Sequence, residues 1–167
     1  PDPEVFKLGQ TTYSQVVQKM GEPIDVKDEQ RDGKNVKSIY YVWANTAGEP
    51  AQKGVIPARA LRFHFYNDTL VGQSFSSSFK SDSTDFDEKK VGDIVKGKTT
   101  RAEVLQLLGQ PSASYIPPLV KEASAKAIGY SYRTTSRHGG RMEFFIKTLS
   151  VAYDDKDVVS DVDYQDS

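Results

Sequence analysis

Short stretches in which apolar and polar residues alternate recur in both halves of the chain, and this period of two is the pattern of half-buried β-strands. In residues 61–66, one leucine and two phenylalanines alternate with Arg62, His64 and Tyr66, so these last three side chains are predicted to point away from the core. The predicted strands are residues 38–43, 61–66 and 70–75 in the first half and residues 128–133, 144–153 and 158–164 in the second.

Two other segments show the period of a short amphipathic helix, and Thr12 and Thr100 are the predicted N-caps. Gln15 and Glu103 follow these threonines at the capping-box spacing, which satisfies two free amides at the start of a helix. A Gly-x-Pro sequence ends each segment, because glycine takes the left-handed C′ position and proline cannot continue the helix. We therefore expect two helices of roughly two turns each.

The two helical segments belong to an internal duplication. Residues 9–23 align without a gap on residues 97–111, an offset of 88, and seven of the fifteen positions are identical. The same offset superimposes the apolar residues of the later strands, so we interpret the chain as two copies of one unit, residues 1–88 and 89–167. The polar segment 80–90 is predicted to join the copies, with its charges in solvent.

The duplication also assigns faces to the first strand of each copy. Tyr40 and Val42 match a pair of tyrosines in the second copy at an offset of 90, which leaves Tyr41 and Trp43 on the open face. Tyrosine, tryptophan and arginine supply most interface hot spots, so this face is the candidate protein-binding site. The alternatives are that the loop 44–59 covers the two aromatic residues or that the strand has the opposite parity. The candidate residues are Tyr41, Trp43, Arg62, His64, Tyr66 and Arg133.

Composition excludes several classes of protein. The 167 residues carry a net charge of -1, which argues against a dedicated nucleic-acid binder, and the length suits one ordinary domain or two small ones. The absence of cysteine removes thiol nucleophiles, disulfides and cysteine-ligated metals. No apolar run approaches the length of a membrane span.

Candidate chemistry is sparse, and we predict no catalytic residue, no metal site and no cofactor. His64 is expected to be a surface histidine on the open sheet face, and His138 lies in a glycine-containing turn. The acidic cluster in residues 82–88 lacks the glycine and glutamate spacing of a calcium-binding loop and is interpreted as a linker. Residues 119–127 are a possible extra helix, serving as a core lid or a partner contact.

The repeated pattern of Gly, Thr-Thr, Val, Gly and Pro at residues 9–23 and 97–111 resembles the SmpA/OmlA family. These outer-membrane lipoproteins include the BamE component of the β-barrel assembly machinery. Two such units in tandem resemble the layout of the β-lactamase inhibitory proteins, in which helices cover one side of a curved antiparallel sheet. The resemblance implies a non-enzymatic periplasmic module that a lipid holds to the outer membrane.

We therefore expect an α+β protein with two tandem repeats, each a helix followed by an antiparallel meander, and with helices packed on one face of a curved sheet. The expected function is a periplasmic protein-binding module that supports envelope or outer-membrane protein assembly. The expected partner is an envelope or outer-membrane protein. The alternative is a proteinaceous inhibitor of a β-lactamase or another hydrolase.

Overall fold

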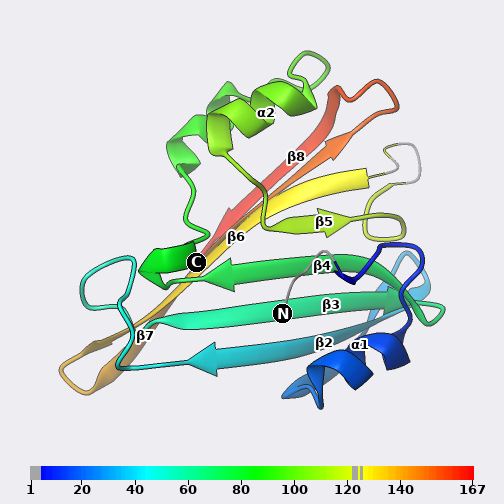
Figure 1. Ribbon diagram of the computed structural model, residues 1–167. Helices are drawn as coiled ribbons and strands as arrows, with labels where there is room; N and C mark the ends of the chain where they lie inside the picture. The colour runs from blue at the N-terminus through cyan, green and yellow to red at the C-terminus, as the bar shows by residue number, and fades with distance from the viewer. Residues whose placement is uncertain (1–4, 122–123, 125) are drawn as a thin grey trace.

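The computed structural model describes residues 5–121, 124 and 126–167. These residues form one antiparallel sheet of eight strands, each hydrogen-bonded to its neighbours in chain order (Figure 1). The strands are β1 (Asp25–Arg31), β2 (Lys34–Ala44), β3 (Ala58–Tyr66), β4 (Thr69–Ser77), β5 (Ala113–Tyr115), β6 (Lys126–His138), β7 (Arg141–Tyr153) and β8 (Val159–Asp166). The helical segments are α1 (Tyr13–Met20), η2 (Lys80–Asp82), η3 (Glu88–Asp93) and α2 (Arg101–Leu108).

The protein is predominantly β, so the predicted α+β class with helices packed as a layer on the sheet is wrong. Helices α1 and α2 have eight residues each, and each buries a single side chain, Val16 or Val104. Helices of this length cannot form a layer, and the curled sheet supplies most of the ordered structure (Figure 1). The strands also run further than the apolar alternation predicts, since β6 and β7 have thirteen residues each.

The helix starts and one of the turns follow from local residue chemistry. Both capping boxes form: the Thr12 hydroxyl accepts from the amide of Gln15, and the glutamine side chain accepts from the amide of Thr12, with the same pair of bonds at Thr100. Asn67 and Asp68 both have positive φ, as the tight turn between β3 and β4 requires. Both predicted caps are therefore confirmed, and the two residues of this turn have the backbone conformation that joins adjacent antiparallel strands.

Two hydrophobic clusters lie on the helix side of the sheet, one against α1 and one against α2. Three side chains of β3, Leu61, Phe63 and Phe65, belong to the first cluster, as the alternation predicts. The first cluster also buries Phe6, Val16, Ile39, Tyr41 and Leu70, and the second buries Phe86, Ile94, Val104, Ile128, Tyr130, Tyr132, Leu149, Val151, Tyr153 and Val159.

Matching hydrogen bonds relate the two halves and correct the predicted parity of β2. The Tyr41 hydroxyl donates to the carbonyl of Gly21 at 2.8 Å, and the Tyr130 hydroxyl donates to the carbonyl of Gly109 at 2.8 Å. Tyr41, and not Tyr40, is therefore the counterpart of Tyr130, at an offset of 89. The predicted open position of Tyr41 is wrong, because this side chain closes the first core under the end of α1.

The short strand β5 joins the two halves into one sheet. Its three residues pair with β4 on one side and with β6 on the other. Gly72 and Gly129 make room for it, since a Cβ atom on Gly72 would lie 2.8 Å from the Tyr115 ring and one on Gly129 would lie 3.2 Å from it. The sheet is continuous across the expected boundary at residue 88, and the division into two units remains a prediction.

The segment that joins the halves is anchored to the sheet, so the prediction of a solvated linker is wrong. The ammonium group of Lys147, which is only 5% exposed, contacts the carboxylate of Asp85 at 2.7 Å and that of Glu88 at 2.6 Å. It also donates to the carbonyl of Phe86 at 2.6 Å. Burial alone would lower the pKa of Lys147, but the hydrogen bonds and charges of the two carboxylates outweigh it and raise this pKa.

The predicted helix at residues 119–127 is also wrong. Lys126 and Ala127 begin strand β6, and residues 119–121 are not helical. Residues 122, 123 and 125 of this predicted helix lie outside the described part of the chain.

We predict that Tyr41→Phe and Tyr130→Phe each lower the free energy of unfolding by about 1 kcal/mol, because each removes one buried hydrogen bond to a helix end. Urea denaturation measures this loss. Tyr153→Phe is the matched control, since its buried hydroxyl has no hydrogen-bond partner among the described residues. A loss of the same size in the control would contradict the assignment.

We further predict that Lys147→Met lowers the free energy of unfolding by about 2 kcal/mol, because the three charge-assisted contacts that hold residues 85–88 are lost. Amide hydrogen exchange is expected to rise in residues 84–93. The exposed Lys156 provides the control Lys156→Met, which should leave both quantities unchanged. Unchanged exchange in the Lys147 variant would show that the segment is held by other contacts.

Candidate protein-binding surface

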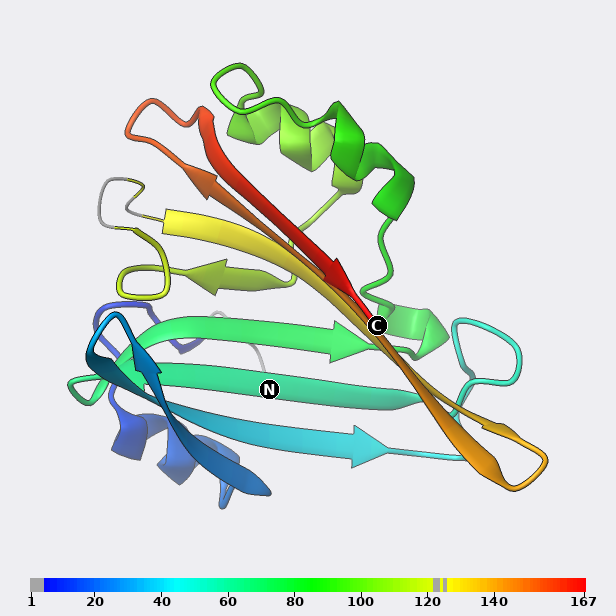
Figure 2. The ribbon, with the colours of Figure 1, turned by 180° about the vertical axis from the view of Figure 1, so that it is seen from behind.

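The face of the sheet turned away from the helices is concave (Figure 2). Its concavity follows from the lining of a hollow of about 350 Å³, to which the first strand, β1, and the last strand, β8, both contribute. The side chains on this face come from positions that alternate with the buried ones, as cross-strand pairs such as Arg62 with Ser74 show. The hollow is lined by Arg31, Arg62, His64, Tyr115, Arg133 and Asp163, among others.

Two arginines lie against one tyrosine on this face. The guanidinium carbon of Arg62 is 4.9 Å from the centre of the Tyr40 ring, and that of Arg133 is 5.4 Å from it. A nitrogen of Arg133 also donates to the Tyr40 hydroxyl at 2.5 Å. Arg62 comes from β3 and Arg133 from β6, so the two halves of the chain build this cluster together.

The positive charge of this cluster is not neutralised within the described residues. Among the residues that the structure describes, no carboxylate lies within ion-pair distance of Arg62 or Arg133, and none forms a hydrogen bond with the guanidinium group of Arg62. Burial, and then the neighbouring charge of Arg62, lower the pKa of Arg133. The two guanidinium groups therefore repel each other, and a negative charge placed between them would relieve this repulsion.

His64 lies in the same hollow and is uncharged at neutral pH. Burial, followed by the charges of Arg62 and Arg31, lowers the pKa of His64 from 6.5 to about 4. Its Nδ1 atom shares a hydrogen bond of 2.6 Å with the hydroxyl of Ser38 on the neighbouring strand. The imidazole therefore adds a polar, neutral surface to the hollow, and the arginines supply its positive charge.

An exposed phenylalanine borders the arginine cluster. Phe144 of β7 is 73% exposed. It lines a second hollow of about 360 Å³ together with Tyr40 and Arg133. Arg133 and Ile146 also line the first hollow, so these two residues lie between the two hollows. This second hollow also has apolar walls, to which Val42 and Ile146 contribute. The concave face thus places unpaired positive charge beside exposed apolar surface.

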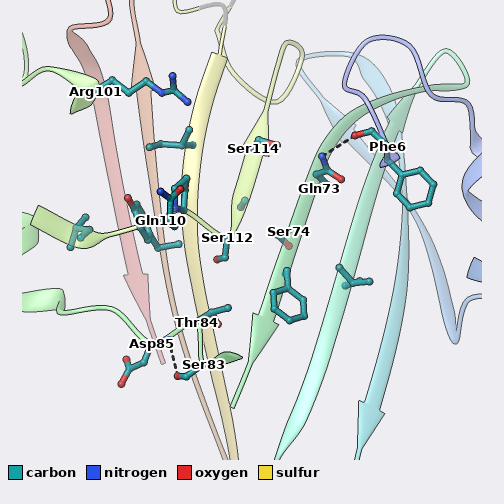
Figure 3. A pocket seen from close by; sticks show the side chains of 17 residues that line it. Phe6, Gln73, Ser74, Ser83, Thr84, Asp85, Arg101, Gln110, Ser112 and Ser114 are labelled. Atoms are coloured by element: carbon teal, nitrogen blue, oxygen red, sulfur yellow. Dashed lines mark hydrogen bonds between the residues drawn. The ribbon is translucent and has the colours of Figure 1, made fainter. Parts of the chain in front are cut away.

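A larger groove of about 660 Å³ lies on the helix side, between the two hydrophobic clusters (Figure 3). Gln73, Ser112 and Ser114 line its middle, and the Gln73 amide donates to the carbonyl of Phe6 at 3.4 Å. Its two charged lining residues are Arg101 and Asp85, and Asp85 is already paired with the buried lysine of β7. The groove therefore offers less unpaired charge than the concave face.

Neither histidine has the surroundings that general acid–base catalysis requires. His64 lies in a hollow, but its hydrogen-bond partner is a serine and its low pKa makes it a weak base. His138 has Glu143 at 3.5 Å, but both side chains are more than 60% exposed on a hairpin.

In the described ranges, no group of three or more His, Asp or Glu side chains is placed to hold a metal ion. Among the described helices, none is long and apolar enough to span a membrane.

The structure brings together three of the six predicted site residues. Arg62, His64 and Arg133 line the concave hollow. Tyr66 is at the end of β3, where Lys34 lies over its ring, and does not line the hollow.

The prediction that Tyr41 and Trp43 share this face is wrong. Tyr41 is buried on the helix side, and Trp43 stacks on its ring at 6.2 Å with 43% of its surface exposed. The loop 44–59 does not explain this placement. Alternate residues of β2 point to the same face of the sheet, and this alternation alone puts Tyr41 and Trp43 on the helix side.

Sequence reasoning missed Tyr40, Tyr115 and Phe144. Shifting the alignment of β2 on β6 by one residue would have found Tyr40, because this shift exchanges the two faces of the strand. An aromatic pair, Phe144-Phe145, in an alternating strand signals that one of the two must lie on the outer face. Tyr115 had no local signal, since its three-residue strand is too short for a period.

Comparisons with known proteins leave the family of the chain open. No protein-family model and no curated protein matches it. A solved structure of a Streptococcus mutans protein, described as a candidate β-lactamase inhibitor protein, is similar with a TM-score of 0.44 and 13% sequence identity. The similarity covers 93% of this chain and 82% of that one. Membership of the SmpA/OmlA family and lipoprotein character find no support in these comparisons.

The lowered pKa of His64 predicts a dependence of stability on pH. The unfolded chain binds a proton near pH 6.5 and the folded chain only near pH 4, so protonation favours unfolding between these values. We expect the free energy of unfolding to fall by about 3 kcal/mol from pH 7 to pH 4 through this residue. His64→Gln should remove this part of the fall, whereas His138→Gln should retain it. Equal pH profiles for the two variants would contradict the assignment.

Proposed function

We propose that this chain is a non-enzymatic protein-binding module that receives part of a partner protein on its concave face. The observation that carries the proposal is the contact of Arg62 and Arg133 with Tyr40, on a face that neither α1 nor α2 covers. Arginine and tyrosine give large interface contributions because each combines a broad, rigid surface with polar groups. A partner that covered this cluster would exclude water from it and strengthen its electrostatic interactions.

The shape of this face suits a protein loop. The two hollows, of about 350 and 360 Å³, lie on either side of Arg133 and Ile146, and the first of them has lining residues from strands at both edges of the sheet. The exposed Phe144 adds an apolar anchor at the border. A protruding loop of a partner could place neighbouring side chains in both hollows at once.

Within this proposal, the partner is an envelope or outer-membrane protein that the chain meets in the periplasm, and binding supports assembly. The inhibitor alternative differs in the partner only, because a β-lactamase or another hydrolase would contact the same face. The resemblance of the duplicated helix motif to the SmpA/OmlA proteins supports the first choice. The tandem layout of the chain, which resembles that of the β-lactamase inhibitory proteins, supports the inhibitor alternative.

Site-directed photo-crosslinking tests the proposal. In one variant, the photo-reactive residue benzoylphenylalanine replaces Ser150, which lies on the concave side because its cross-strand neighbour Gly129 is beside Tyr115. In the control variant, it replaces Lys98, which is exposed before α2. We expect a discrete adduct from envelope extract at position 150 and none at position 98. A purified β-lactamase, with its hydrolysis rate as a second readout, tests the inhibitor alternative in parallel.

The charge of the face provides the matched variants. Arg62→Glu is expected to abolish the adduct at position 150, because it reverses one charge of the cluster that the partner covers. Lys98→Glu makes the same change of charge away from this face and should leave the adduct unchanged. Circular dichroism confirms that both variants fold. An adduct that forms at position 98, or that survives Arg62→Glu undiminished, would contradict the proposed surface.

A further inference from the structure

We infer that the concave face recognises a carboxylate, from an aspartate or glutamate on a partner's loop, that binds between Arg62 and Arg133 beside Tyr40. This inference rests on the proposed function and names the chemistry of the residue that the partner inserts. It follows from the balance of charges around the cluster, from the hydrogen-bond donors left free there and from the apolar hollow next to it.

The charges that border the hollow leave a local positive excess. On β1, Arg31 lies 3.9 Å from Glu29, so this arginine has a partner. Arg62 and Arg133 have none among the described residues, while Asp163 of β8 is the acidic side chain in the lining of the hollow. Two unpaired cations thus face one carboxylate across the hollow. Asp25 and Glu29 of β1 line a further hollow of about 140 Å³ together with Arg62, but each of them lies near a cation of its own strand, Lys27 at 3.8 Å and Arg31 at 3.9 Å. An incoming negative charge near Tyr40 would be attracted, and an incoming positive charge would be repelled.

The free donors match a carboxylate in geometry. Arg133 uses one terminal nitrogen for the Tyr40 hydroxyl, and the guanidinium of Arg62 makes no hydrogen bond to the described residues. The remaining N–H groups of a planar guanidinium form a fork that fits the two oxygens of a carboxylate. The ring of Tyr40 holds both guanidinium groups in place, which lowers the entropy lost when they bind.

The apolar surroundings favour a carboxylate carried by a protein over a free anion. The second hollow, which Tyr40 also lines, has walls formed by Val42, Ile146 and the exposed ring of Phe144. A residue adjacent to the inserted acid would bury apolar surface there, and a free anion would gain nothing from these walls. We therefore expect the recognised loop to carry an acidic residue next to an apolar one.

Asp163 argues against a doubly charged group such as phosphate. It lines the same hollow from β8, on a strand at the sheet edge opposite β1. A second negative charge on the bound group would be repelled by this carboxylate, whereas a single charge would be held by the two arginines. The inference therefore commits to a side-chain carboxylate, and inorganic phosphate serves as a competitor in its test.

Selection from a library tests the inference without a known partner. Short loops of random sequence, displayed on phage within a fixed scaffold, are selected on the wild-type chain after counter-selection on an Arg62→Gln, Arg133→Gln double variant. We expect the selected loops to share an aspartate or glutamate next to an apolar residue. Replacing this acid by its amide should weaken binding about tenfold or more. Arg62→Gln should do the same, and Lys98→Gln should not.

The outcomes separate the inference from the function on which it rests. Selected loops that lose affinity on Phe144→Ala, but keep it when their acidic residue is neutralised, would overturn the inference and leave the proposed surface standing. Loops that bind elsewhere, or the selection of none, would overturn both. Full competition by millimolar inorganic phosphate would show a general anion site and would also overturn the inference. Thermal unfolding of each arginine variant confirms that any loss of binding is not a loss of folding.

Discussion

The pairing of β5 with both β4 and β6 is the contact on which the rest of the structure depends. Three residues complete a single sheet from two meanders, and the space for Tyr115 exists because Gly72 and Gly129 have no side chains. One continuous sheet has only two faces, so each residue on the face away from the helices belongs to a single surface. For this reason Arg62 and Arg133, far apart in the sequence, contact the same tyrosine.

The sequence predicts the parts of the fold that local chemistry decides. The capping boxes at Thr12 and Thr100 and the alternation in residues 61–66 depend on neighbours within a few positions, and the structure confirms them. Strand β1 is different, because all seven residues are exposed and no apolar alternation exists. Its signal is the Asp32-Gly33 pair at the turn that follows, where both residues have positive φ. The α+β class is wrong because two eight-residue helices cannot form a layer, and because polar or very short strands such as β1 and β5 enlarge the sheet.

The candidate site was harder to predict because it depends on strand parity and on contacts between distant segments. Aligning β2 on β6 with an offset of 90 residues, where the structure has 89, assigns Tyr41 and Trp43 to the wrong face of the sheet and leaves Tyr40 out of the site. The apolar alternation in residues 61–66, by contrast, assigns Arg62 to the correct face. The unpaired arginines also depart from what stability favours, since like charges that share one ring repel each other. Departures of this kind are expected at functional sites, where a partner supplies the missing charge.

A double-mutant cycle between Arg62 and Arg133 is the sharpest test of whether residues from the two halves share one face as unpaired charges. The free energy of unfolding is measured for Arg62→Gln, Arg133→Gln and the double variant at low and high salt. We predict that the free energy of unfolding of the double variant is about 0.5 kcal/mol lower than the value expected from adding the effects of the two single substitutions. This difference is the coupling energy, and salt should reduce it. Zero coupling, or coupling of the opposite sign, would contradict a shared cluster of unpaired charge.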